Sequence, residues 1–224
     1  ASYGVVPILH ECSVEVEKGE LAVIVGPNGA GKSTVMRVLL GMLEATSGSV
    51  TLDGNDISML STQDRIAQGL AFVPQTKNVF PSMTVEENLQ MGGFIREDDI
   101  SKTIEEVYEL FPILYEKRKQ LAEELSGGQR QQVAFGRAMM TRPSVMLLDE
   151  PTAGVSPIVM DEIFSNILDV RNAGMAVLMV EQNAQQALNI ADKGFVLVSG
   201  RNEHTGTGKE LIKDREVRKK FLGG

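Results

Sequence analysis

The stretch LAVIVGPNGAGKST, residues 21 to 34, decides the fold. Its first five residues are all apolar, which predicts a strand covered on both faces, because a half-exposed strand alternates apolar and polar side chains. The loop that follows has the spacing G-x-x-x-x-G-K-[ST], carried by Gly26, Gly31, Lys32 and Ser33. A helix is expected to begin near Lys32. Strand, glycine-rich loop and helix in this order predict an anion-binding turn.

The residues of this loop suit the phosphates of a nucleotide. They are Gly26, Pro27, Asn28, Gly29, Ala30, Gly31, Lys32, Ser33 and Thr34. Glycines let successive amide N–H groups point inward, and the following helix adds the positive end of its dipole. Lys32 is predicted to reach the β- and γ-phosphates, Ser33 to bind Mg²⁺, and Thr34 to meet the α-phosphate. A tight turn without a ligand is the alternative, and the strand-to-helix context argues against it.

Outward from this loop, further short apolar runs predict an α/β fold with a largely parallel sheet. These runs are residues 70–74, 145–149, 176–180 and 195–199. Two other segments, 13–20 and 49–56, alternate apolar and polar residues and end in turn residues. They predict half-exposed antiparallel strands beside the core.

Between these runs lies a stretch of helical character. Ile100, Ile104 and Val107 recur at helical spacing before Pro112 ends the pattern, and no clear strand interrupts residues 84–142. We expect one domain over residues 1–224, in which a helical subdomain of about 76–142 is inserted into a nucleotide-binding core formed by about 1–75 and 143–224.

Composition excludes several classes of function. The chain has 224 residues, with 22 Lys plus Arg against 30 Asp plus Glu, and the net charge of -8 argues against a nucleic-acid partner. The single cysteine, Cys12, cannot form an internal disulfide, as is usual in a reducing compartment. The apolar runs are far shorter than the roughly 20 residues that span a bilayer, and no charged-then-apolar leader opens the sequence.

A second motif, VMLLDEP at residues 145–151, ends a predicted buried strand with two acids. Asp149 stands where phosphate-loop enzymes carry a carboxylate that orders Mg²⁺. Glu150 points elsewhere, because side chains alternate along a strand, and it could face an attacking water as general base. A plain polar strand end is the alternative, but burying two acids costs free energy without a cation.

A third motif, LSGGQ at residues 125–129, predicts a helix start. Ser126 and Gln129 have the spacing of a capping box, and Gly127 and Gly128 leave the first amides of the helix bare. Such an end can hold a phosphate. Because the chain already has a phosphate loop, a second anion site is useful if it closes over the nucleotide of another copy.

Together, the three motifs resemble those of the ATP-binding cassette ATPases in order and interval, over essentially the whole chain. The resemblance implies a RecA-like phosphate-loop core, ATP and Mg²⁺ as ligands, and ATP hydrolysis. It also implies that Tyr3 stacks on adenine and that Gln75 senses Mg²⁺ and the attacking water. Finally, it implies a head-to-tail dimer in which Ser126, Gly127, Gly128 and Gln129 of one chain face the ATP of the other.

Two positions depart from the family pattern. Many relatives carry a histidine that contacts the γ-phosphate, but Gln182 takes that place here, and the histidines His10 and His204 lie elsewhere. A glutamine amide can donate a hydrogen bond but cannot exchange a proton near neutral pH. We therefore expect Glu150 to carry the base role and Gln182 to position groups. Ser156 stands where many relatives have an aspartate that crosses to the partner chain.

The segments PTAGVSP, VEQNAQQAL and VFPSMTVEENL are similar to the ATPase subunits of branched-chain amino acid importers. This resemblance implies permease subunits in the membrane, a dimer with itself or with a sister ATPase, an indirect link to a substrate-binding protein, and a cytoplasmic place at the inner face of the cell membrane. It also implies a first strand ahead of Ala1. Apolar Val79, Phe80 and Met83 lie in a loop before a capping box at Thr84 and Glu87, where relatives receive a membrane subunit. Lipid or lipopolysaccharide export, a mechanical ATPase, and a scaffold in metal-cluster assembly remain alternatives.

Overall fold

The computed structural model describes residues 1–221. A six-stranded sheet lies at the centre, with the order β10-β9-β3-β8-β7-β6. Its strands are β3 (Leu21–Val25), β6 (Leu70–Val73), β7 (Val145–Asp149), β8 (Ala176–Glu181), β9 (Lys193–Val198) and β10 (Arg201–Gly206). The pairs within β9-β3-β8-β7-β6 are parallel, and β10 pairs with β9 antiparallel at one edge. The predicted largely parallel sheet is confirmed, and five of its strands start and end within two residues of the predicted runs.

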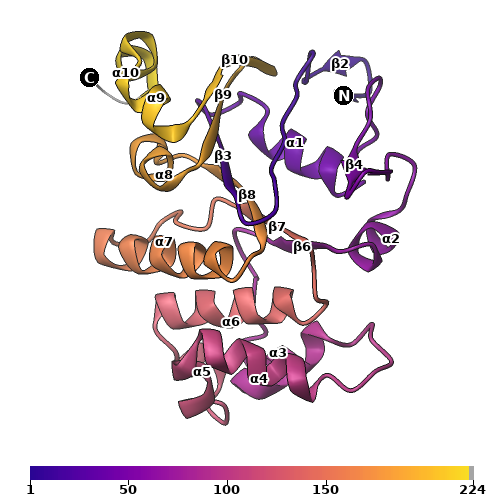
Figure 1. Ribbon diagram of the computed structural model, residues 1–224, viewed down its shortest axis with the longest axis vertical. Helices are drawn as coiled ribbons and strands as arrows, with labels where there is room; N and C mark the ends of the chain where they lie inside the picture. The colour runs from indigo at the N-terminus through magenta and orange to yellow at the C-terminus, as the bar shows by residue number, and fades with distance from the viewer. Residues whose placement is uncertain (222–224) are drawn as a thin grey trace.

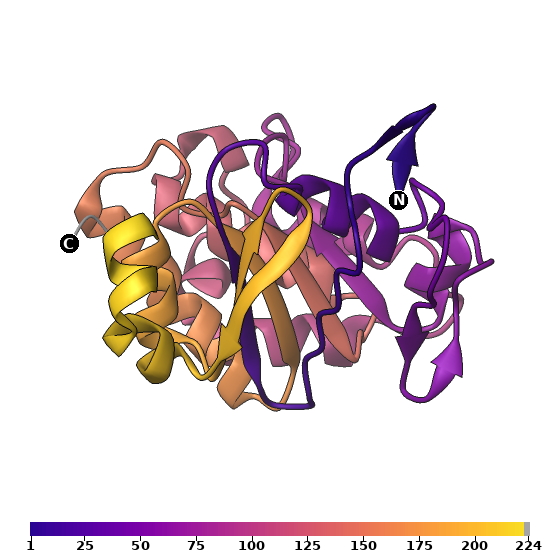
Figure 2. The same ribbon diagram turned by 90° about the horizontal axis from the view of Figure 1, so that it is seen from above.

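Helices cover both faces of this sheet (Figures 1 and 2). The helices of the sheet-bearing part are α1 (Lys32–Leu39), α2 (Thr62–Ala67), α7 (Pro157–Asn172), α8 (Ala184–Ile190), α9 (Gly208–Lys213) and α10 (Arg215–Phe221). Along β3 the side chains alternate: Ala22 and Ile24 pack with Val35 and Met36 of α1. The intervening Leu21, Val23 and Val25 join the other core, which includes Ile163 of α7 and Leu188 of α8. The period of two therefore builds one core on each face.

Residues 76–142 are helical apart from their loops. They hold α3 (Val85–Gly92), α4 (Ser101–Leu110), α5 (Pro112–Glu116), the short 3₁₀ helix η1 (Ala122–Glu124) and α6 (Gly127–Met139). Figure 1 shows these helices together in the lower half of the molecule, with α6 between them and α7. Val133 and Phe135 of α6 are fully buried in the core that continues to β3, so the helical part is anchored to the sheet through α6.

The capping box predicted at Thr84 begins α3 as expected: its hydroxyl accepts a hydrogen bond from Glu87 N, and Glu87 Oε2 accepts one from Thr84 N at 2.7 Å. Residues 49–56, predicted as one half-exposed antiparallel strand, form two short strands that pair antiparallel with each other, β4 (Thr51–Leu52) and β5 (Asn55–Asp56). The turn residues Asp53 and Gly54 both have positive φ, 49° and 79°, which is the conformation that a two-residue hairpin loop requires.

The strand predicted over residues 13–20 is wrong. Val14 and Val16 do pack against the core on the α1 side, as their alternation indicated. However, no strand among residues 1–221 forms a ladder of hydrogen bonds with this segment. The side chain of Asn202 on β10 instead accepts a hydrogen bond from Ser13 N at 3.2 Å and donates one to Ser13 O at 2.6 Å. Another antiparallel pair forms between β1 (Ser2–Tyr3) and β2 (Val6–Pro7).

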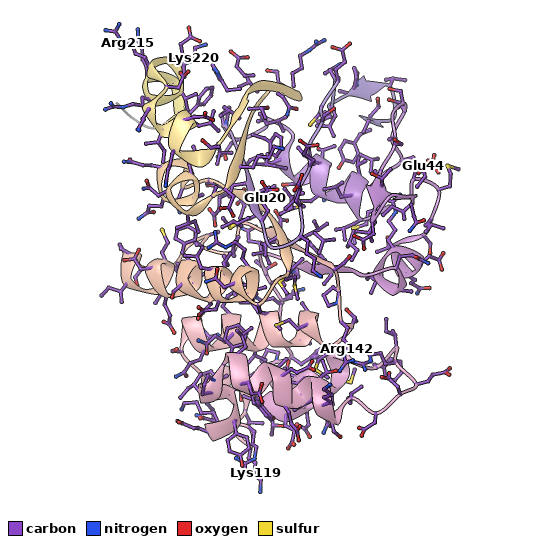
Figure 3. All side chains as sticks on the ribbon, in the orientation of Figure 1. Glu20, Glu44, Lys119, Arg142, Arg215 and Lys220 are labelled. Atoms are coloured by element: carbon purple, nitrogen blue, oxygen red, sulfur yellow. The ribbon has the colours of Figure 1, made fainter. Side chains whose placement is uncertain are left out.

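Most charged side chains lie at the periphery, and the buried ones among residues 1–221 are Lys32, Arg65, Glu150 and Glu181. Figure 3 shows Lys119 and Arg215 pointing outward at opposite ends of the molecule, and Glu44 at its side. Among residues 1–221, no helix combines the length and the hydrophobicity that crossing a bilayer requires.

Candidate functional site

The candidate site lies where parallel strands end. Because β3, β6, β7 and β8 run in the same direction, their carboxyl ends meet at one edge of the sheet, where ligands of α/β proteins bind. Val25 at the end of β3 is in register with Glu181, and Asp149 with Val180 of β8. The phosphate loop, Gln75, the two acids and Gln182 directly follow or end these strands, so the topology collects the predicted residues from four distant parts of the chain.

The loop after β3 has the backbone of an anion cradle. Gly26 has φ 155°, and a Cβ at this position would lie 2.1 Å from the carbonyl oxygen of Leu197. Gly31 has φ 104° and begins α1, as its left-handed N-cap. Neither position accepts a larger residue without moving its neighbours. The two glycines therefore allow the chain to turn sharply from a buried strand into a helix whose first amides stay free.

Lys32 is held inside this loop. It is 5% exposed, and its Nζ donates to the carbonyl oxygens of Gly26 at 2.9 Å and Pro27 at 3.3 Å. Neutral carbonyl oxygens stabilise a buried ammonium group much less than an anion would. Lys32 forms no ion pair with a carboxylate of residues 1–221, so its ammonium group is available to a phosphate group.

A cavity of about 430 Å³ opens over this loop. Its lining residues are Ile8, Asn28, Gly29, Gly31, Lys32, Ser33, Thr34 and Glu150. Ser33 is exposed, so its hydroxyl is available to a ligand. Glu150 therefore shares one cavity with the phosphate loop, which is the arrangement that the sequence predicts.

Glu150 is fixed by two amides. Its Oε2 accepts a hydrogen bond from Gln182 Nε2 at 2.7 Å and a longer one from Gln75 Nε2 at 3.4 Å. Its backbone lies in the left-handed region, at φ 46°, which a residue with a side chain adopts at a cost of about 1 kcal/mol. This conformation turns the chain between the two acids, so Glu150 and Asp149 face different neighbours. The three predicted residues Glu150, Gln182 and Gln75 thus form one cluster.

Asp149 is half-buried at the end of β7. Burial, followed by the nearby charge of Glu150, raises the pKa of Asp149, and Arg37 and Lys32 partly oppose this rise. A carboxylate whose charge is disfavoured in this way gains from a nearby cation. No group of three or more acidic, histidine or cysteine side chains that could hold a metal occurs in residues 1–221. A cation here would need oxygen atoms from a bound phosphate in addition to Ser33 and Asp149, which is how Mg²⁺ is commonly held.

The signature segment begins α6 as predicted. Ser126 Oγ accepts from Gln129 N at 3.2 Å, and Gln129 Oε1 accepts from Ser126 N at 3.1 Å. A Cβ on Gly127 would first meet Val159 of α7 at 3.6 Å, and one on Gly128 would meet the Glu162 carboxyl group. α6 lies in the lower half of Figure 1 and α1 in the upper half. Within one chain, therefore, the structure does not bring the signature to the phosphate loop.

Tyr3 lies beside α1 rather than in the cavity lining. Its hydroxyl accepts a hydrogen bond from Arg37 Nη1 at 3.0 Å, and the guanidinium lies 5.8 Å from the ring centroid. The ring is 42% exposed and can stack on a base.

Ser156 caps α7 through its hydroxyl, which accepts from Val159 N at 3.5 Å.

Some functional candidates were not found from the sequence. Glu181, 1% exposed at the end of β8, accepts hydrogen bonds from both loops that carry Glu150 and Gln182. An acid that ends the apolar run AVLMV was the available signal, and it is the same signal that identified Asp149. Asn78 Nδ2 donates a hydrogen bond to Gln131 Oε1 of α6 at 2.9 Å, which joins the loop after Gln75 to the signature helix. No sequence pattern predicts this contact.

Other cavities lie outside this cluster. One of about 280 Å³ adjoins the phosphate loop and is lined by Gly26, Gln182 and Lys220 of α10, among others; Figure 3 shows Lys220 at the top of the molecule. A larger cavity of about 730 Å³ lies between residues 14–18 and 49–53, over the amino ends of β6 and β7. Charged residues line it (Glu15, Glu17, Lys18, Asp53 and Arg142), but none of the predicted site residues does, so size does not identify the site here.

Comparison with known proteins identifies the family of this chain. Residues 9–153 match the family described as ABC transporter. The high-affinity branched-chain amino acid transport ATP-binding protein BraG of Pseudomonas aeruginosa is 44% identical over 223 residues, covering 99% of this chain and 96% of BraG. The lipopolysaccharide export system ATP-binding protein LptB of Haemophilus influenzae is 34% identical, covering 99% of this chain and 93% of LptB. The ADP conformation of MJ1267, an ATP-binding cassette of an ABC transporter, superposes with a TM-score of 0.89 at 30% identity, over 100% of this chain and 96% of MJ1267.

Proposed function

The chain belongs to the ABC transporter family, and on that premise we propose that it powers the import of branched-chain amino acids through permease subunits in the membrane. The chain is the ATP-binding and ATP-hydrolysing subunit of a transporter. The transported solute follows from similarity alone, because BraG, at 44% identity, is named for this transport and LptB, at 34%, for lipopolysaccharide export. In this proposal the solute passes through the permease subunits and does not bind this chain.

In this proposal Glu150 is the general base. Gln182 and Gln75 both donate to its Oε2, while its Oε1 accepts no hydrogen bond from residues 1–221. Oε1 is therefore the oxygen that can take the proton of a water molecule attacking the γ-phosphate. Gln182 holds the carboxylate in place and, as an amide, takes no proton itself.

Lys32, Ser33 and Thr34 bind and orient the triphosphate in the cavity over the loop. Ser33, Asp149 and Gln75 would hold Mg²⁺, which, when bound, neutralises phosphate charge and polarises the bond that breaks. The raised pKa of Asp149 fits this role, because it shows that the surroundings disfavour the ionised carboxylate, and a nearby cation would stabilise that ionised form.

A second copy completes the site. Ser126, Gly127 and Gly128 present a helix start that no phosphate of the same chain can reach, and the helix behind it spans 13 residues. Its amides and dipole would stabilise negative charge on the partner's γ-phosphate. We therefore expect a head-to-tail dimer of this chain with itself or with a sister ATPase, with one ATP at each seam.

The contact with permeases lies on the helical part. Val79 is 8% exposed and belongs to the core, whereas Phe80 is 40% exposed with the Arg137 guanidinium 4.8 Å from its ring centroid. Further along this part, Phe94 is 79% and Ile95 58% exposed. Apolar side chains exposed in this density suit a helix from a membrane subunit. Such partners would hold the chain at the cytoplasmic face of the membrane, where a substrate-binding protein acts on it only indirectly.

The cluster of Glu150, Gln182 and Gln75 beside the phosphate loop is the observation that carries the hydrolytic part of the proposal. The experiment is uptake of labelled leucine, isoleucine and valine by cells in which the chromosomal copy carries Glu150→Gln, with Lys119→Ala as a matched surface control. Loss of uptake in the first strain alone supports the proposal. Normal uptake with impaired delivery of lipopolysaccharide to the surface would replace it with export. Copurification with soluble assembly factors instead of permeases would exclude transport.

A further inference from the structure

Glu181 is a buried carboxylate that the proposed function leaves unused. It is 1% exposed, and an ionised carboxylate in the interior destabilises the folded protein unless hydrogen bonds compensate for its lost hydration. All its partners are donors from the chain itself. Oε1 accepts from Thr152 N at 3.0 Å and from Thr152 Oγ1 at 2.7 Å. Oε2 accepts from the main-chain N of Gln182 at 3.0 Å and of Asn183 at 3.5 Å.

These bonds join two loops that follow neighbouring strands. Thr152 belongs to the loop after β7, and Gln182 and Asn183 to the loop after β8. A further hydrogen bond, from Asn183 Nδ2 to Thr152 Oγ1 at 3.2 Å, reinforces the connection. Thr152 and Glu181 are both 1% exposed, so water does not compete for the hydrogen bonds between them. The carboxylate therefore sets the spacing between the loops.

One loop carries Glu150, the proposed base, and the other carries Gln182, the amide that holds it in place. Glu150 precedes Thr152 by two residues, and Gln182 directly follows Glu181. Their side chains meet in the 2.7 Å hydrogen bond from Gln182 Nε2 to Glu150 Oε2. These contacts thus close a ring. It runs from Glu150 along the chain to Thr152, through the hydrogen bonds to the Glu181 carboxylate, on to Gln182, and back to Glu150. If the carboxylate link opens, the loops can separate and the side-chain contact on the other side of the ring loses its geometry.

The geometry points to Glu181 as a positioning residue for hydrolysis, which acts by keeping Gln182 and Glu150 in contact. Glu181 is buried and does not line the cavity over the phosphate loop. This inference rests on the proposed roles of Glu150 and Gln182 and adds a residue to them.

Glu181→Gln tests it, because the amide keeps the shape but replaces one acceptor oxygen with an NH₂ group that faces N–H donors. We expect kcat for ATP hydrolysis to fall about tenfold or more, with KM for ATP within about twofold, since the phosphate loop is untouched. Thr152→Val removes a single hydroxyl and should lower kcat in the same direction by less. Thr152→Ser, which keeps the hydroxyl, should restore it. These two variants test the inference even if Glu181→Gln folds poorly.

A double-mutant cycle with Gln182→Ala separates positioning from a purely structural role. If Glu181 acts through Gln182, Glu181→Gln lowers kcat by less than about twofold when Gln182 is already alanine. An equal loss in both backgrounds, or unchanged kcat in Glu181→Gln and Thr152→Val, overturns the inference while leaving the proposed function standing. Unchanged kcat in Gln182→Ala alone overturns both the inference and the proposed role of Gln182.

Discussion

Replacing Gln182 by alanine removes the shortest hydrogen bond that Glu150 receives. In the structure Gln182 Nε2 lies 2.7 Å from Glu150 Oε2, and the second donor, Gln75 Nε2, lies at 3.4 Å. Glu150 is 9% exposed, but Gln182 is exposed, so water can partly replace the amide. The alanine variant thus tests whether this contact holds the base in its working position.

Its effect can be worked out from the bond. A hydrogen bond to a charged group contributes about 1.5–3 kcal/mol, and about 1.4 kcal/mol corresponds to a tenfold change in a population. If this bond keeps the Glu150 carboxylate aligned, its loss lowers the aligned fraction, and with it kcat, by roughly 10- to 150-fold. Exposure of Gln182 places the expected value near the lower end.

The assay is steady-state phosphate release at saturating ATP, with binding of a fluorescent ATP analogue measured in parallel. Gln186→Ala is the matched control, because Gln186 is an exposed glutamine on α8 and should leave kcat unchanged. A Gln182→Ala variant with kcat within about twofold of the unmodified chain would refute the reasoning. So would an equal loss in the Gln186 control.

Three further predictions follow from single contacts. Lys32→Ala, which removes the buried ammonium group, should weaken binding of the ATP analogue at least about tenfold, whereas Lys18→Ala should not; equal affinities would contradict the assigned phosphate loop. Asp149→Asn should raise the Tm of the nucleotide-free protein at pH 7. Because folding raises the pKa of Asp149, the folded protein is more stable at low pH, where Asp149 is protonated, and loses this stability as the pH rises through the raised pKa. The gain in Tm from Asp149→Asn should therefore shrink toward pH 4, and a gain that does not shrink would argue against this. Gly136→Ala should lower Tm by about 2–10 °C, because its Cβ would lie 2.6 Å from Val107 Cγ1 and 2.9 Å from Leu89 Cδ2; Gly127→Ala, with 3.6 Å to its nearest neighbour, should not.

The parallel core could be predicted because its strands are continuously apolar. LAVIV needs only to be covered on both faces to form β3, and this requirement is local to its own side chains. The capping boxes at Thr84 and Ser126 were equally local, since each is closed within four residues. Strand β10, RNEHTG, was missed because it is polar throughout and exists through its pairing with β9.

The segment 13–20 shows the converse error. Its alternation correctly indicated that Val14 and Val16 face the core, but alternation does not supply a partner strand. Burial and strand pairing are separate conditions, and the second depends on distant parts of the chain.

In the candidate site, the sequence predicted residue types and the structure supplied their contacts. Glu150, Gln75 and Gln182 are separated by up to 107 residues, and only the parallel register brings their side chains to one oxygen. Glu181 was overlooked because a single acid at a strand end has no motif around it, and its four donors come from two loops.

The central claim is that two copies close over ATP, with the signature helix of each facing the phosphate of the other. The direct measurement is molar mass by light scattering of the Glu150→Gln protein with ATP and Mg²⁺. We predict a dimer with ATP, a monomer with ADP, and no dimer when Gly127→Asp is added, because Gly127 has room for a side chain and the new charge would repel the partner's phosphate. Gly127→Asn, which is similar in shape but neutral, should dimerise better than Gly127→Asp. A monomer for Glu150→Gln under every condition, or a dimer that is indifferent to the charge at residue 127, would contradict the account.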